Sequence, residues 1–214
     1  YNSDKNAAFT YSVNATLTKI NNKIEELIPG IENQTVPTNF RNELAPLTNR
    51  VGQPVYSYYV LKTDGIFQSQ AEADNYKNAK GQKIQPNAKA GDFKFVDING
   101  DGSIDSKDRY FAGSAYPDFS YRLSFNASYK NFDFNIFAQG VQGNKLFNAV
   151  KRTTYSASGP SYNKLVGILD AWSPENPGGK VPIISTSDAN GNFAASDFYI
   201  ENNDFSNFKS VKTL

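Results

Sequence analysis

The sequence predicts an all-β protein, a segment of an antiparallel transmembrane β-barrel with long loops. Three observations predict this fold class. Two neighbouring segments alternate strictly between apolar and polar side chains over about ten residues each, as long strands do. The chain carries 16 Phe and 13 Tyr, residues that favour strands. The stretches between the alternating segments are long, polar and rich in Asn, Gly and Pro.

The clearest element is a hairpin formed by residues 118–129 and 132–142, with Lys130 and Asn131 as a two-residue turn. Pairing across that turn matches Tyr129 with Phe132 and brings the two apolar faces to the same side of the sheet. We expect one face to meet lipid, and it comprises Tyr121, Leu123, Phe125, Phe134 and Ile136.

Residues 9–18 repeat the alternation and predict a third long strand. A soluble strand averages ~5–6 residues, whereas a strand that crosses a membrane needs ~9–11. Aromatic residues at the strand ends match the interfacial girdle of a membrane barrel, as at Phe9, Phe119, Tyr129 and Phe132. A soluble β-sandwich with one buried face per sheet gives the same alternation and stays open as an alternative.

Outside these long strands, the sequence predicts only a few short elements. A short apolar run at 55–61 indicates a strand, and residues 66–80 indicate a short helix with Ser69 as its N-cap. A last strand is expected at 205–214. The stretches 19–53 and 144–203 read mostly as loop, which is unusual in compact soluble domains and normal on the outer face of a large barrel.

Composition excludes several classes of function. The 214 residues contain no Cys and no His, so thiolate metal sites, disulfides and the commonest general base are all absent. With 22 basic and 21 acidic residues and no basic stripe, no nucleic-acid partner is expected. No apolar run approaches the ~18 residues of a membrane helix. There is no Met, even at position 1, which indicates a processed product or a piece of something longer.

Residues 97–108 have oxygen-bearing side chains at the spacing of an EF-hand calcium loop, with Gly102 at the sharp turn of position six. The expected ligands are Asp97, Asn99, Asp101, Asp105 and Asp108, with the carbonyl of Ser103. Position twelve is Asp instead of the usual Glu, and the flanking residues do not look helical. We expect a structural calcium ion, with magnesium as the lesser alternative. An Asp/Asn/Gly-rich turn without metal is the other alternative.

Five ordered blocks resemble the SusC/RagA family of TonB-dependent (TonB-linked) outer-membrane transporters of Bacteroidetes. The blocks are 51–68 (with VGQPV, then YY, then TDGIFQ), 91–102 (GDFKFVDINGDG), 117–119 (PDF), 134–144 (FNIFAQGVQGN) and 172–177 (WSPENP). Together they run nearly from end to end. The final segment, 205–214, resembles the family only loosely.

This resemblance implies that residues 1–214 are part of one barrel domain of about 22 strands, with the plug domain outside these residues. It implies nutrient import across the bacterial outer membrane, of an oligosaccharide or a peptide, and no enzymatic activity. The implied partners are a SusD-like surface lipoprotein, TonB through the missing N-terminal part, and outer-membrane lipid.

Two other functions stay open at this point. One is a secreted, calcium-stabilised β-domain for glycan binding or adhesion. The other is a hydrolase, for which Asp170, Glu175 and Glu201 are candidate acids, although none lies in a motif and solvated roles suit them better. The loop aromatics Tyr155, Tyr162 and Trp172 could stack on sugar rings, but loop packing suits each of them better. We therefore expect no catalytic residues and name no substrate-binding residue.

Overall fold

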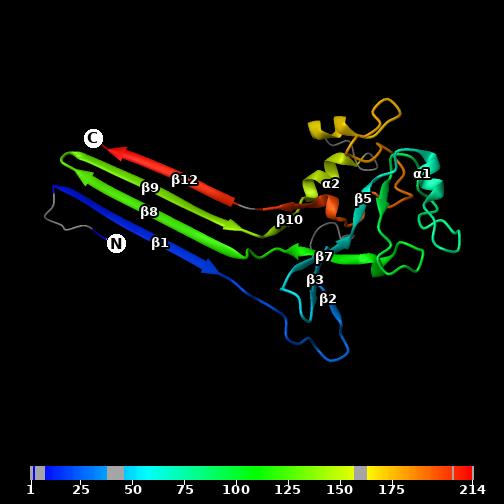
Figure 1. Ribbon diagram of the computed structural model, residues 1–214, viewed down its shortest axis with the longest axis horizontal. Coiled ribbons are helices and arrows are strands. Elements are labelled where there is room, and N and C mark those ends of the chain that lie inside the picture. Colours follow the sequence, from blue (N-terminus) through cyan, green and yellow to red (C-terminus); the bar gives the residue numbers. More distant parts are fainter. Residues whose placement is uncertain (1, 3–7, 38–45, 157–162, 204, 214) are drawn as a thin grey trace.

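The computed structural model describes residues 2, 8–37, 46–156, 163–203 and 205–213, the last of these as backbone. Figure 1 shows two parts: a long antiparallel sheet, and a unit of short strands and helices at one end of that sheet.

Four strands form the long sheet, in the order β1-β8-β9-β12. They are β1 (Phe9–Lys19), β8 (Phe119–Tyr129), β9 (Phe132–Gln142) and β12 (Phe205–Thr213). The first three have 11 residues each and the fourth has 9, so each has the length that a tilted membrane-crossing strand needs. The structure confirms the long strands predicted at 9–18 and 205–214, with Leu214 outside the described residues.

The hairpin of β8 and β9 has the predicted register. Tyr129 pairs with Phe132, Ala127 with Phe134 and Phe125 with Ile136. Lys130 adopts a positive φ of 50°, as the first residue of a tight hairpin turn does. Both the two-residue turn and the shared apolar face are therefore confirmed.

The apolar face of the long sheet is open in the described part of the chain. Figure 1 shows no second layer over this sheet. Large apolar side chains are exposed on it, among them Leu123, Tyr129, Phe132 and Phe134. This arrangement does not support the alternative of a β-sandwich, which would bury this face against a second sheet. Among the described residues, no helix is long and apolar enough to span a membrane.

Two long stretches leave the sheet at the same end. We call residues 20–118, between β1 and β8, the first connection, and residues 143–204, between β9 and β12, the second connection. Because consecutive strands run antiparallel, both connections start and finish beyond one end of the sheet, and the Lys130–Asn131 turn lies at the other end (Figure 1).

The first connection holds most of the short elements. It contains β2 (Asn33–Thr35), β3 (Leu47–Arg50), β4 (Ser57–Leu61), β5 (Thr63–Ile66), α1 (Gln70–Asn75), β6 (Phe93–Phe95), η1 (Ser106–Asp108) and β7 (Arg109–Ser114). Strands β2, β3, β4 and β7 form one sheet, and β5 pairs with β6.

Two sequence predictions are corrected in this connection. The strand predicted at 55–61 begins only at Ser57, because the turn before it places Tyr56 at a positive φ of 52°. The helix predicted at 66–80 is shorter, although Ser69 is its N-cap as expected. It ends after Asn75 because the following residues fold back, with Ile84 donating a backbone hydrogen bond to the carbonyl of Tyr76.

The second connection is more ordered than the sequence predicted. It contains β10 (Lys145–Phe147), α2 (Ala149–Tyr155), η2 (Val166–Asp170), η3 (Asp197–Tyr199) and β11 (Ile200–Asn202), with β10 paired to β11. These elements are too short to give a periodic signal. They owe their order to packing against the first connection, which the core clusters show. In one cluster, Tyr58 and Val60 of β4 pack with Ala195, and in another, Phe93 and Phe95 of β6 pack with Trp172.

Candidate functional site

The two connections pack against each other through buried polar side chains, and we call this interface the seam. The Nδ2 of Asn192 donates to Asp92 Oδ1 at 2.7 Å, and Asn192 Oδ1 accepts from the backbone N–H of Phe93 at 2.9 Å. Asn192 and Asp92 are 2% and 7% exposed. No local sequence pattern marks these residues, so sequence reasoning missed them.

A second set of bonds crosses the seam at Asp197. Its Oδ1 accepts from the backbone N–H of Thr63 at 3.0 Å and from the Thr63 hydroxyl at 2.6 Å, and its Oδ2 accepts from the Tyr110 hydroxyl at 3.1 Å. Burial and the neighbouring Asp197 carboxylate raise the pKa of Tyr110 to about 12. The phenol therefore stays protonated and keeps donating at any physiological pH.

Trp172 packs in the apolar cluster beside the seam. Its indole N–H donates to Gln68 Oε1 at 3.1 Å, and its ring is 7% exposed. Gly91 lies against it with a positive φ of 91°, and a Cβ there would come within 2.5 Å of the Trp172 ring. The predicted packing role of Trp172 is thus confirmed. Tyr155 ends α2 and is half-buried beside Phe198, while Tyr162 lies outside the described residues.

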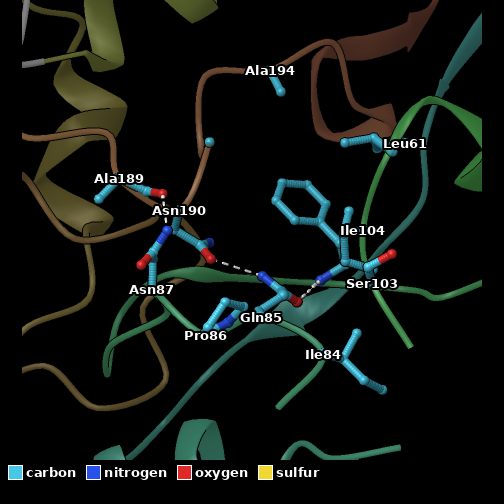
Figure 2. Close-up of a pocket in the computed structure, with 12 residues that line it drawn as sticks. Leu61, Ile84, Gln85, Pro86, Asn87, Ser103, Ile104, Ala189, Asn190 and Ala194 are labelled. Atoms are coloured by element: carbon cyan, nitrogen blue, oxygen red, sulfur yellow. Dashed lines mark hydrogen bonds between the residues drawn. The ribbon is translucent and has the colours of Figure 1, made fainter. Parts of the chain in front are cut away.

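A pocket of about 450 Å³ opens between the connections (Figure 2). The first connection contributes Gln85, Asn87 and Ile104 to its wall, and the second contributes Asn190 and Ala194. Figure 2 shows the amide groups of Gln85 and Asn190 pointing toward each other, and Gln85 Nε2 donates to Asn190 Oδ1 at 2.8 Å.

The lining of this pocket restricts its chemistry. None of the described residues that line it has an ionisable side chain. Gln85 uses both its amide N–H groups and its carbonyl to bind Phe93, Asn190 and Phe95. An uncharged solute would therefore meet mainly apolar walls and amide groups that already have partners.

The predicted metal loop lies beside this pocket, and Ser103 and Ile104 belong to both. Its oxygen-bearing side chains curl the backbone by accepting N–H groups a few residues ahead. Asp97 accepts from Gly100 and Gly102, Asn99 from Asp101, Asp101 from Ser103, and Asp105 from Lys107, at 2.6–3.0 Å. Gly102 has a positive φ of 92°, as the sharp turn at position six requires. Hydrogen bonds from Ser103 and Asn99 lower the pKa of Asp101, so its carboxylate stays charged.

Asp108 plays a different role from the other expected ligands. It is 0% exposed, and its carboxylate accepts backbone N–H groups from Ile98 at 2.9 Å, Asn99 at 3.4 Å and Asp105 at 2.8 Å. These bonds close the loop from inside. Across the described ranges, no group of three or more Asp, Glu, His or Cys side chains is gathered in a metal-binding arrangement. Five of the six expected ligands lie on the accessible part of this loop, and the sixth, Asp108, is buried inside it.

Two of the candidate hydrolase acids, Asp170 and Glu201, have separate partners. Glu201 lies 3.7 Å from Lys151 and accepts a hydrogen bond from Asn148, which is a structural role. Asp170 ends η2 and accepts from the backbone N–H of Lys180 at 3.4 Å, and Glu175 is exposed.

The polar face of the long sheet forms a hydrogen-bonded track across three strands. Asn126 donates to the hydroxyl of Ser12 at 3.1 Å, and Asn135 donates to Asn126 in turn. Nearby, the Arg122 guanidinium covers the ring of Phe137 at 4.9 Å. The two faces of this sheet therefore differ in chemistry, one apolar and one suited to water.

Comparison with known proteins gives relatives of one kind. The chain is 32% identical to TonB-dependent receptor P26 of Formosa agariphila over 162 residues, which are 76% of this chain and 16% of that protein. It is 27% identical to TonB-dependent receptor P3 of the same organism over 179 residues, 83% of this chain and 17% of that protein. The chain thus spans about a sixth of the length of these relatives. No family model matches it.

Solved structures of the RagAB system share the fold. The RagAB peptide transporter matches 96% of this chain with a TM-score of 0.68 at 18% identity, over 20% of its own chain. The RagAB peptide importer in its closed-closed state matches 97% with a TM-score of 0.68 at 18% identity, over 21% of its chain. This likeness and the sheet topology confirm the predicted fold class, an antiparallel segment of a β-barrel. The relative that is 32% identical over 76% of this chain shows that the chain belongs to the TonB-dependent receptors.

Proposed function

We propose that this chain is the part of an outer-membrane nutrient importer in which a wall of the barrel carries two outward-facing connections. The observation that carries the proposal is the separation of the sheet's two ends. Both long connections leave one end, and the Lys130–Asn131 turn closes the other. Outer-membrane barrels have short periplasmic turns and long external loops, so the connections lie outside the cell.

The two faces of the sheet support the same proposal. The apolar face, with Leu123 and Phe134 exposed, meets lipid. The opposite face, with Arg122 and the Ser12–Asn126–Asn135 track, lines the interior of the barrel. Lipid outside and water inside require this alternation.

The partners and the cargo follow from the family. We infer that the receptor works with a SusD-like surface lipoprotein, receives energy from TonB through a part outside these residues, and takes up an oligosaccharide or a peptide. The structurally similar RagAB protein is a peptide transporter, which supports the peptide alternative. Import needs no covalent step: the ligand would shift the populations of open and closed states.

Fractionation tests this proposal on the full-length protein. We expect the protein to sediment with the outer membrane, to need detergent for extraction, and to co-purify with a surface lipoprotein. Recovery as a soluble monomer without detergent would overturn it in favour of a secreted β-domain.

We also propose that residues 97–108 bind one structural calcium ion. Asp97, Asn99, Asp101 and Asp105 would supply side-chain oxygens and Ser103 its carbonyl, because the hydrogen bonds within the loop leave lone pairs on these oxygens. Asp108 would hold the loop closed from within and reach the ion at most through one oxygen. The spacing of the oxygen-bearing side chains in this loop supports a bound cation.

A further inference from the structure

We propose that the two connections open and close as one cooperative body, and that Asn192 is the residue that couples them. This inference concerns the resting receptor and does not depend on which solute is imported. The barrel then carries one external unit, and a contact made by either connection changes the opening equilibrium of both.

The contacts of Asn192 carry the first step. Its side chain binds Asp92 and Phe93 of the first connection, and Asn190 of its own connection donates to the same Oδ1 at 2.9 Å. Its backbone carbonyl accepts from the hydroxyl of Tyr199, which is 0% exposed. Every polar atom of the Asn192 side chain thus faces a partner in a buried setting, where a lost bond leaves an unsatisfied group.

Asp92 makes the coupling mutual. Its second oxygen accepts from the backbone N–H of Lys89 at 2.8 Å, so the carboxylate holds the turn that leads into β6. If the connections separated, Asp92 would keep this turn bond but lose Asn192 as its side-chain donor. Separation would therefore take one donor from the Asp92 carboxylate and the acceptor from Asn192 Nδ2, while Asn192 Oδ1 would keep the bond from Asn190.

Backbone bonds cross the seam on both sides of this pair. Leu61 donates to the carbonyl of Ala195 at 2.9 Å, and Ile183 donates to the carbonyl of Gly91 at 2.8 Å. These bonds and the Asp197 contacts lie along one seam, and the apolar cluster of Phe93, Phe95 and Trp172 packs across it. Because these contacts are contiguous across one interface, we expect them to break in a single cooperative opening.

Hydrogen exchange of the full-length receptor in detergent tests the proposal without a ligand. In the unmodified protein, the amides of Leu61, Phe93 and Ile183 should exchange with one common opening free energy and one common dependence on denaturant. In Asn192→Ala, exchange at Leu61, Phe93 and Ile183 should rise together, by about tenfold or more. The amides of β8 and β9 should be unchanged, which shows that the barrel is folded.

Asn176→Ala is the matched control. Asn176 is also an asparagine of the second connection, but its side chain donates to the carbonyl of Ala171 in that same connection, at 3.1 Å. We expect its exchange effect to stay within residues 171–179. The proposal is overturned if Asn192→Ala loosens only residues 188–196, or if Leu61 and Ile183 open with different free energies in the unmodified protein.

Discussion

Asn192 donates a 2.7 Å hydrogen bond to Asp92, a residue 100 positions earlier in the chain, and both side chains are buried. This bond joins two segments that are separated in sequence by the whole β8–β9 hairpin. The unit formed by the two connections therefore depends on long-range pairing, and its stability should respond to single changes along the seam.

Gly91 offers the sharpest such change. In Gly91→Ala the new Cβ would lie 2.5 Å from the Trp172 ring and 2.6 Å from the Ile183 Cβ, where neither neighbour can move away easily. We expect the seam to lose about 1–3 kcal/mol of stability from overpacking, in addition to the cost of the left-handed backbone. Limited proteolysis of the full-length receptor measures this loss as faster cleavage within the two connections.

Gly100→Ala is the control for backbone strain. Gly100 also has a positive φ, of 74°, but nothing lies within 4 Å of its added Cβ. It should show only the backbone cost, about 1 kcal/mol. Equal cleavage rates for the two variants would argue against close packing at Gly91.

Asp188 predicts a pH dependence. Burial raises the pKa of its carboxyl above the ordinary 3.8, and its buried Oδ1 has no hydrogen-bond partner among the described residues. Because the folded state binds this proton more tightly than the unfolded state, the contribution of Asp188 to the free energy of unfolding is greatest below pH 3.8 and falls as the pH rises through the raised pKa. At pH 7 the charged Asp188 therefore costs stability.

The substitution Asp188→Asn removes that cost. We expect the variant to be more stable than the unmodified receptor at pH 7 and to lose this advantage when the pH falls below 3.8. Thermal unfolding of the unit formed by the two connections, measured at several pH values, checks the sign. A gain that is the same at every pH would show that the carboxylate charge is not its source.

Leu123 tests the assignment of the sheet faces. An arginine on the lipid face near the middle of a strand costs about 2–4 kcal/mol, whereas one on the interior face costs little. Leu123→Arg should therefore reduce the amount of folded receptor in the outer membrane, and Ser124→Arg, one residue further along the same strand, should not. Heat-modified mobility in a gel reports the folded fraction. The reverse order would exchange the two faces.

If residues 97–108 bind calcium, titration of the receptor with calcium should release or absorb heat. Calorimetry of the full-length receptor with calcium should give one site of modest affinity, and the variant Asp97→Ala plus Asp101→Ala should give none, because two side-chain ligands are lost. Equal heats for both proteins, or heat from neither, would leave an ordinary turn closed by Asp108.

The hairpin could be predicted from sequence because its information is local. A period of two fixes the faces, and a two-residue turn at Lys130 and Asn131 fixes the register. The seam could not be predicted, since Asp92 and Asn192 belong to no motif and meet only after both connections fold. The burial of Asp108 was missed for a related reason. Spacing identifies a ligand position, but not whether its oxygens already bind the loop's own backbone.

The most direct test of the proposed orientation is cysteine labelling of the full-length receptor in intact cells, in a background without other reactive cysteines. This chain has no native Cys, and both Lys80 and Asn131 are exposed. A maleimide that cannot cross the outer membrane should label Lys80→Cys, in the first connection, in whole cells. It should label Asn131→Cys, in the tight turn, only after the outer membrane is opened. Labelling of Asn131→Cys in intact cells with protection of Lys80→Cys, or equal labelling of both without opening the membrane, would contradict the account.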